Sequence, residues 1–370
     1  MSGVDEATDR RFMAAALRLS RKHAGLTATN PAVGTLIVRD DGNGPVIVGR
    51  GVTAVGGRPH AEAEAMAEAG DLARGATAYV TLEPCAHHGR TPPCANALVA
   101  AGIARVVGAA SDPDPRVSGK GYAILRQAGI EVVERVLADQ AADQLAGYLM
   151  RSVSKRPQVT LKLALSSDDM IGRMGEGQIA ITGAASRRQV HLMRAEADAI
   201  LIGINTALAD DPELTVRLPG LESRSPARIV LDRLARLDPA SKLARSAQSV
   251  PVFVAIDAEA DAGRRGKLEA LGVKFISTDT FEGRIALPEL LEDLAAQGIM
   301  DVLVEGGAGT ARAFLEDGMV DRLVLFQGPQ PLGAGGIASP VSRDHMPEGF
   351  RLLREARFGD DAYGEWIRDS

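Results

Sequence analysis

The sequence predicts two consecutive α/β domains, each built on a largely parallel sheet. The chain has 370 residues, more than the roughly 100–200 residues of one typical domain. Short β-rich runs alternate with helical patterns along it, as they do in folds with a parallel sheet. The pattern is interrupted in the segment 145–156, which loses its periodicity just before Pro157. We therefore expect a first domain at residues 1–150 and a second at residues 151–370.

The individual elements follow from apolar spacing and from turn residues. In the first domain, helices are expected at Phe12–Ser20, Ala61–Ala69 and Cys94–Ala101. Strands of this domain are expected at Gly34–Val38, Val46–Gly51, Thr77–Leu82 and Arg105–Ala110. The first two should pair across a turn rich in Asp, Gly and Asn. In the second domain, helices are expected between several of the strands. These strands are expected at Gln158–Leu165, Ala199–Gly203, Ala227–Leu231, Val250–Ile256, Val302–Val304 and Asp321–Phe326.

Composition and charge narrow the classes of function. A hydrophobic fraction of 45% with 24% charged residues is ordinary for a globular protein. The net charge of −6 and the lack of a dense basic run argue against a nucleic-acid partner, whereas a small anionic substrate needs only one or two arginines. The sequence shows neither a signal peptide nor an apolar run of about 18 residues, so we expect no membrane contact and a cytoplasmic location. In that reducing compartment, the two cysteines favour metal binding or catalysis over a disulfide.

Four residues of the first domain predict a catalytic zinc site. His60 and Glu62 stand at the start of an expected helix, and Cys85 and Cys94 follow an expected strand. Because the leading residue of a helix need not be helical, His60 can face the metal while Glu62 faces its water. Cys85 should precede a loop or a helix, and Pro84 fits the first position of a helix, where the dipole would stabilise the Cys85 thiolate. One His and two Cys ligands leave the fourth zinc position open, as catalysis requires.

The expected chemistry is hydrolytic deamination. Zinc lowers the pKa of a bound water towards about 7, and Glu62 would accept the water proton and return it to the ring and the leaving amine. Nucleobase deaminases carry this arrangement of His-x-Glu and Pro-Cys with a second cysteine. Taken singly, a buried cysteine is a small hydrophobe and a histidine a satisfied polar group, so the prediction depends on their combination. A purely structural zinc ion is the alternative, and it would leave Glu62 without a role.

Around these residues the sequence resembles the bifunctional riboflavin-biosynthesis deaminase–reductase family. The resemblance lies in Tyr79–Cys94, whose eight residues between the cysteines contrast with two in general cytidine-type deaminases, and in Asn30–Gly34 and Ser111–Pro115. It implies a cytidine-deaminase-like α/β/α sandwich that removes the 2-amino group of 2,5-diamino-6-ribosylamino-4(3H)-pyrimidinone 5′-phosphate. It also implies substrate contacts from Asn30 and His88, with His87 and Arg90 beside the base or phosphate.

Three features stand out in the second domain. Lys162 places a charge inside an expected strand, and residues 206–217 form a polar run that we expect to be a loop. The strand ending at Val304 runs into Glu305 and a glycine-rich turn before a helix. This order exposes backbone N–H groups to a phosphate, although such turns are also common as purely structural features. It is not the Gly-x-Gly-x-x-Gly fingerprint of a Rossmann fold.

These features resemble the reductase domain of the same family. The resemblance implies a dihydrofolate-reductase-like fold, NADPH as cofactor, hydride transfer to C1′ of the opened ribose, and a homo-oligomer, namely a dimer. The residues that it assigns to NADPH are Ala164, Thr206, Asp210, Gly307, Ala308 and Gly309. The residues that it assigns to the pyrimidine ribosylamine phosphate are Lys162, Arg194, Leu214, Arg217 and Glu305.

The sequence departs from the family pattern at two places. Asp169 replaces a glycine in a Ser-x-Asp-Gly motif, at a position where a positive φ is expected. The segment Gly175–Thr182 lacks the family's tryptophan. These departures leave open a single-activity deaminase with a non-catalytic C-terminal domain. A nucleic-acid-editing deaminase is the other alternative, opposed by the acidic charge and the long loop between the cysteines.

Overall fold

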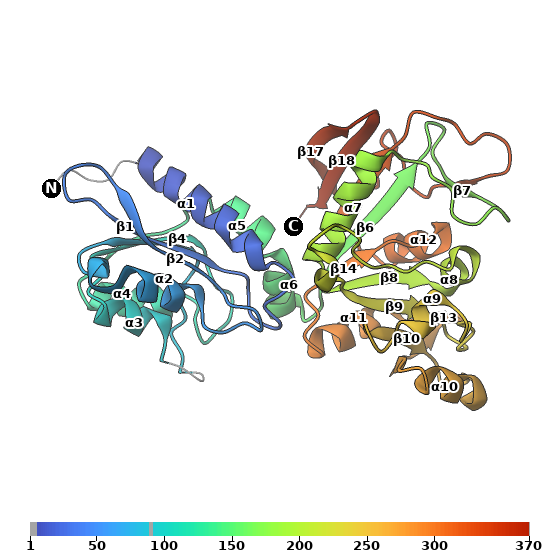
Figure 1. The fold of residues 1–370 in the computed structure, drawn as a ribbon, viewed down its shortest axis with the longest axis horizontal. Helices are drawn as coiled ribbons and strands as arrows, with labels where there is room; N and C mark the ends of the chain where they lie inside the picture. Colours follow the sequence, from blue (N-terminus) through green and yellow to red (C-terminus); the bar gives the residue numbers. More distant parts are fainter. Residues whose placement is uncertain (1–5, 89–91, 370) are drawn as a thin grey trace. The chain divides into compact units, whose positions relative to one another are not determined.

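The computed structural model describes residues 6–88 and 92–369. The chain divides into two compact units that meet between Lys155 and Arg156, and each is described by itself (Figure 1). Among the described residues, no helix has both the length and the apolar character needed to cross a membrane. All ten strands expected from the sequence are present, with bounds that shift by at most two residues.

Unit 1 contains five strands and six α-helices among its described residues. The strands are β1 (Gly34–Arg39), β2 (Val46–Val52), β3 (Thr77–Leu82), β4 (Arg105–Ala110) and β5 (Glu131–Val133). The helices are α1 (Glu6–Ser20), α2 (Ala61–Ala69), α3 (Cys94–Ala100), α4 (Lys120–Gln127), α5 (Ala138–Gln144) and α6 (Ala146–Ser154).

The unit 1 sheet has the order β2-β1-β3-β4-β5 and lies between two helical layers. Strands β3, β4 and β5 are parallel, whereas β1 runs antiparallel to both β2 and β3. The sheet is therefore less parallel than the sequence predicts. Helices α1 and α5 cover one face, and α2, α3 and α4 cover the other (Figure 1). The sandwich places both α2 and α3 beside the carboxyl end of β3.

Two glycines let helix α2 approach the sheet closely. A Cβ on Gly51 would lie 1.9 Å from the carbonyl oxygen of Ala61, and one on Gly49 would lie 2.2 Å from that of Ala65. Both contacts are with the backbone of α2, which cannot move aside as a side chain can. The depth of α2 against β2 is therefore set by the absence of these two side chains, and with it the position of His60 and Glu62.

We expect Gly51→Ala to destabilise unit 1 by about 1–3 kcal/mol or more, because the added methyl group must displace α2. The same displacement should weaken zinc binding, since His60 precedes the helix directly. Calorimetry and the release of zinc to a chromophoric chelator measure the two effects. Gly266→Ala is the control, since a Cβ at that position meets no atom within 4 Å. Unchanged zinc affinity in Gly51→Ala would contradict the role given to the close approach.

Unit 2 contains the remaining elements. Its large sheet comprises β6 (Gln158–Leu165), β8 (Ala199–Gly203), β9 (Ala227–Leu231), β10 (Val252–Ile256), β11 (Lys274–Ser277), β14 (Asp301–Val304), β15 (Arg322–Gln327), β17 (Phe350–Phe358) and β18 (Asp361–Arg368). Short strand pairs are formed by β7 (Met170–Arg173) with β16 (Gly336–Ala338), and by β12 (Thr280–Phe281) with β13 (Arg284–Ile285). The helices are α7 (Ala184–Glu196), α8 (Ile204–Asp210), α9 (Lys242–Arg245), α10 (Ala262–Glu269), α11 (Leu287–Ala296) and α12 (Ala308–Glu316).

The large sheet has the order β11-β10-β9-β8-β14-β6-β15-β18-β17 and is parallel from β11 to β15. Alternate side chains of its strands enter two separate cores. Ile200 and Val230 pack with residues of α8, α9 and α10, whereas Leu201 and Ile229 pack with residues of α11 and α12. The carboxyl ends of β6, β14, β8 and β9 therefore meet along one edge, where ligands bind in open α/β sheets.

The structure differs from the sequence-based expectations in several segments. The segment 145–156, expected to lack regular structure, is mostly helix α6, because Tyr148 and Leu149 pack against the unit 1 core. Thr206 and Asp210 lie in helix α8 rather than in a loop, and only residues 211–217 are irregular. The hairpin of β17 and β18 has no counterpart among the expected elements.

The turn between β6 and β7 accommodates Asp169 in the backbone conformation expected of a glycine. Asp169 has φ of 60°, and its side chain accepts a hydrogen bond of 3.1 Å from Nε2 of Gln327. Short polar side chains adopt this left-handed region more readily than other residues do. This departure from the family pattern therefore preserves the turn.

Candidate metal centre and reductase cavity

The three predicted metal ligands lie together in unit 1. Their ligand atoms are all within 4.8 Å of one another. Nδ1 of His60 is 3.3 Å from Sγ of Cys94 and 3.7 Å from Sγ of Cys85. His60 is the N-cap residue of α2 and has an extended backbone, so it is not held to the helical spacing that would otherwise separate it from Glu62.

Of the two continuations allowed after Cys85, a loop or a helix, the structure has the loop. Residues 83–86 are irregular, and it is Cys94 that starts helix α3, directly after Pro93. The two cysteines lie close together, and the backbone N–H of Cys94 donates to Sγ of Cys85 over 3.2 Å. The N–H group that stabilises the Cys85 thiolate therefore comes from the start of α3, nine residues further along the chain.

The surroundings of this cluster shift the pKa values of Cys85 and Glu62 in opposite directions. Hydrogen bonds from the Cys94 thiol, the His60 ring and the Cys94 backbone lower the pKa of Cys85 to about 4. Burial and the neighbouring Cys85 charge raise the pKa of Glu62 to about 7. Glu62 is only 4% exposed, so its carboxyl group is shielded from bulk water. A carboxyl group with a pKa near neutrality can both accept and return a proton.

The donor set fits zinc. An imidazole nitrogen and two sulfurs are the ligands that zinc prefers, and three of them leave one position open. Nδ1 of His60 faces the two sulfurs, so it is the nitrogen that would bind the ion. The zinc site predicted from the sequence is therefore assembled by the fold.

The structure assigns no ligand contact to the other described residues expected at the deaminase site, and their surroundings are as follows. Asn30 is half-buried against Gly57, and His88 is exposed. His87 has a buried Nδ1 that lacks a hydrogen-bond partner among the residues described. Asp112 accepts hydrogen bonds of 3.1 Å from the Tyr148 hydroxyl group. Arg90 lies outside the described residues, and the substrate contacts of Asn30 and His88 stay predictions.

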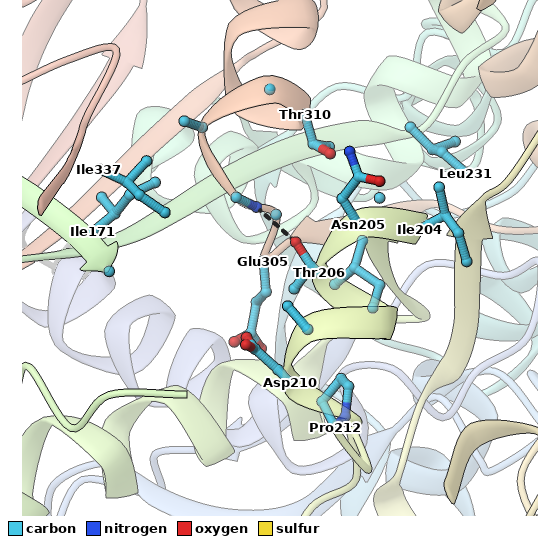
Figure 2. Close-up of a pocket in the computed structure, with 18 of the residues that line it drawn as sticks. Ile171, Ile204, Asn205, Thr206, Asp210, Pro212, Leu231, Glu305, Thr310 and Ile337 are labelled. Carbon is cyan, nitrogen blue, oxygen red and sulfur yellow. Dashed lines mark hydrogen bonds between the residues drawn. The ribbon is translucent and has the colours of Figure 1, made fainter. Parts of the chain in front are cut away.

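Unit 2 contains a cavity of about 1220 Å³ along the carboxyl edge of its sheet (Figure 2). Small-molecule pockets commonly have about 300–1,000 Å³, so this one has room for a dinucleotide and a second ligand. It is lined by all the predicted cofactor and substrate residues of the domain except Arg217, namely Lys162, Ala164, Arg194, Thr206, Asp210, Leu214, Glu305, Gly307, Ala308 and Gly309. Arg217 is exposed and forms an ion pair of 3.0 Å with Glu213.

A buried carboxylate holds two cations at one end of the cavity. Glu305 accepts from Nε of Arg194 over 2.6 Å and from Nη2 over 3.0 Å, and Nζ of Lys162 lies 3.5 Å away. Burial opposes ionisation of Glu305, but the Arg194 and Lys162 charges outweigh it and lower its pKa to about 2. The charge in strand β6 thus has a partner, which explains why Lys162 is tolerated there.

The glycine-rich turn after β14 is shaped for a phosphate ligand. Gly307 is the N-cap residue of α12, and its N–H group donates to Oγ1 of Thr206 over 3.2 Å, as Figure 2 shows. A Cβ on Gly309 would meet no atom within 4 Å, so a side chain there would enter the cavity. Free N–H groups at the start of a helix suit a pyrophosphate, and the cavity therefore fits NADPH.

The sequence analysis missed part of the cavity lining. Asn205, Leu231, Arg233 and Arg236 line it, and each follows or ends strand β8 or β9. No motif marks these residues. The signal that could have found them is their place at the carboxyl ends of the parallel strands β8 and β9, on one side of β14 in the sheet. The missing tryptophan leaves apolar lining in its segment, since Ile179 and Ile181 face the cavity.

Comparison with known proteins agrees with both sites. The family described as "Cytidine and deoxycytidylate deaminase zinc-binding region" matches residues 6–110, and the "RibD C-terminal domain" matches residues 157–362. The riboflavin biosynthesis protein RibD of Aquifex aeolicus is 39% identical over 327 residues, 88% of each chain. That of Escherichia coli is 39% identical over 337 residues, 88% of this chain and 89% of its own.

Solved structures give the same result. Acinetobacter baumannii RibD has a TM-score of 0.85 at 36% identity, covering 99% of this chain and 100% of that one. A Thermotoga maritima protein, titled a diaminohydroxyphosphoribosylaminopyrimidine deaminase/5-amino-6-(5-phosphoribosylamino)uracil reductase, has a TM-score of 0.84 at 32% identity, covering 98% of this chain and 99% of its own. The chain therefore belongs to the RibD family of riboflavin-biosynthesis enzymes and joins a zinc-binding deaminase domain to a pyrimidine reductase domain.

Proposed function

We propose that unit 1 deaminates 2,5-diamino-6-ribosylamino-4(3H)-pyrimidinone 5′-phosphate, with Glu62 as its acid–base catalyst. The observation that carries this is the meeting of His60, Cys85 and Cys94 beside a buried Glu62. When bound there, zinc supplies a water of lowered pKa. The Glu62 carboxylate would accept a proton from the water that adds to C2 of the ring and pass this proton to the adjacent ring nitrogen. It would then carry the proton of the new C2 hydroxyl group to the amino group, so that the C2–N bond breaks, ammonia departs and a carbonyl forms at C2.

In unit 2, the cavity residues bind the deaminated product beside NADPH, which supplies the hydride. Arg194 and Lys162 are held by Glu305 at the end of the cavity that receives the ribosylamine phosphate. The turn at Gly307–Gly309 and Thr206 hold the pyrophosphate. Opening of the ribose breaks the bond between C1′ and the ring oxygen, which becomes the C4′ hydroxyl group, and leaves an imine between C1′ and the exocyclic nitrogen. The hydride would then pass to C1′ while the imine nitrogen takes up a proton, which gives the ribitylamino chain.

A coupled assay with the diaminopyrimidine phosphate tests both activities and their order. We expect ammonia release without NADPH, and oxidation of NADPH only after deamination. A zinc chelator should stop ammonia release, yet leave the reduction of a separately supplied deaminated substrate intact. Ammonia release with no substrate-dependent oxidation of NADPH would instead indicate a single-activity deaminase.

We further propose a cytoplasmic homodimer. The zinc ligands include the two free cysteines, which a reducing compartment keeps as thiols. Strand β17 is an edge of the large sheet, and its Leu352 and Leu353 are 48% and 39% exposed. An edge strand with exposed apolar residues can pair with a second copy. Sedimentation equilibrium measures the mass, and a monomer at all concentrations would contradict the dimer.

A further inference from the structure

The cavity of unit 2 is lined by six cationic side chains, and five of them have a carboxylate oxygen within 3.5 Å. Lys162 and Arg194 face Glu305, as described above. The other pairs are Arg173 with Glu176 at 3.2 Å, Arg233 with Asp257 at 2.7 Å and Glu259 at 3.1 Å, and Arg284 with Glu316 at 3.2 Å. For Arg236, the nearest carboxylate oxygen recorded among the described residues is Oδ1 of Asp232, 3.8 Å from Nε.

The local structure fixes the position of Arg236 in the cavity lining. Asp232 is fully buried, and its Oδ2 accepts from the backbone N–H of Leu237 over 2.8 Å, which closes the turn that carries Arg236. Nη2 of Arg236 donates to Oδ1 of Asn205 over 3.3 Å. The Arg236 side chain is 44% exposed, so its remaining N–H groups are accessible to a ligand.

Arg236 and the hydride-transfer site lie at different ends of the sheet edge. Lys162 belongs to β6 and Arg236 follows β9, and β14 and β8 lie between these strands. Three strand spacings amount to about 14 Å. The glycine turn that follows β14 lies between the two ends. Figure 2 shows Asn205, Ile204 and Leu231 on the side of the cavity opposite Ile171 and Ile337.

This order matches the order of groups in NADPH. With the reactive ring near Lys162 and Glu305 and the pyrophosphate at Gly307–Gly309, the adenosine half reaches the end of β9. There Ile204 and Leu231 offer an apolar wall to the base. The 2′-phosphate is a monoester that carries up to two negative charges, and arginine binds such oxygens with its planar fork.

We propose that Arg236, assisted by Asn205, binds the 2′-phosphate of NADPH and makes unit 2 select NADPH over NADH. The proposal rests on the reductase function proposed above and adds to it the residue that sets cofactor specificity. Because NADH lacks the 2′-phosphate, Arg236 contributes to the binding of NADPH and not to that of NADH.

Equilibrium binding by titration calorimetry tests this without turnover. The probes are NADPH, NADH, adenosine 2′,5′-bisphosphate and 5′-AMP. In Arg236→Gln, we expect the Kd of NADPH and of the bisphosphate to rise about 10-fold or more, as for a lost charged hydrogen bond, while that of NADH and 5′-AMP stays constant. Arg236→Lys keeps the charge but loses the planar guanidinium group. Its Kd for NADPH should lie between those of the unmodified protein and Arg236→Gln.

The control is Arg245→Gln, which removes the same charge from an exposed residue of α9 outside the cavity lining. It should bind all four probes as the unmodified protein does. If Arg236→Gln loses affinity equally for NADPH and NADH, or loses affinity for neither, the assignment of Arg236 is overturned. If the unmodified protein binds neither dinucleotide, the proposed reductase function itself fails. The fluorescence of the buried Trp366 in each variant verifies that unit 2 is folded.

Discussion

Replacing Glu62 by glutamine is expected to lower deaminase turnover by about 10³-fold, while the chain retains one zinc ion. Glutamine has nearly the same shape but can neither accept the proton of the attacking water nor return it to the leaving amine. His60, Cys85 and Cys94 are unchanged, so the metal stays. Initial rates of ammonia release and metal analysis of the same sample measure the two results. Reduction of deaminated substrate in unit 2 should proceed at the unmodified rate.

Glu64→Gln is the matched control for this substitution. Glu64 lies two residues further along α2 and is exposed, so its replacement changes the charge equally without touching the cluster. It should leave turnover within about twofold of the unmodified enzyme, as expected for a surface substitution. A purely structural zinc ion would predict full activity in Glu62→Gln, and that outcome would remove the acid–base role.

Glu305→Ala is expected to abolish reduction and to destabilise unit 2 by about 3–5 kcal/mol, because Arg194 and Lys162 would remain as uncompensated buried charges. Trp366 is the chain's one tryptophan and is 7% exposed in unit 2, so its fluorescence reports the unfolding of that unit. Urea titrations measure the difference. Glu316→Ala removes a surface ion pair with Arg284, and it should lower the free energy of unfolding by at most about 1 kcal/mol. Equal stability of the two variants would contradict the buried pairing.

The contribution of Glu305 should also depend on pH in a defined direction. Its pKa is lowered from 4.5 to about 2, so ionised Glu305 stabilises the folded state. This contribution, about 3 kcal/mol, is complete above the unfolded pKa and is lost as the pH falls from about 4.5 towards about 2. The stability gap between the unmodified protein and Glu305→Ala should therefore narrow over that range. A gap that stays constant from about pH 6 to pH 3 would contradict the ionised pair.

The zinc site was predictable because its chemistry is concentrated in few residue types. His60, Glu62, Cys85 and Cys94 have a spacing that serves metal binding and proton transfer, and the fold brings them together. The sequence predicted the helix that begins at Cys94, but Pro84 also fitted the start of a helix that does not form. Both cysteines follow a proline, so this signal alone does not distinguish Cys94, at the start of α3, from Cys85, which lies in irregular structure.

The elements that sequence analysis missed depend on tertiary contacts. Strand β17 is almost entirely exposed, so its side chains show no alternation of apolar and polar residues, and its pairing with β18 defines it. Helix α6 contains a glycine and a valine that weaken its intrinsic propensity, and packing of Tyr148 and Leu149 outweighs them. Arg236 carries no motif, because its position comes from the neighbouring strand order.

The turn at Asp169 also bears on how such enzymes are recognised in genomes. What this position requires is a backbone with positive φ, and the Gln327 contact helps an aspartate to meet that requirement. A search pattern written as an invariant glycine would reject this chain, although its turn is intact. A pattern that admits glycine, asparagine and aspartate represents the backbone dihedral angle that the turn requires, and not one residue type. A search that tests for a residue able to adopt positive φ at this position would find diverged reductase domains that a strict glycine pattern misses. It would also judge better whether their turn can form.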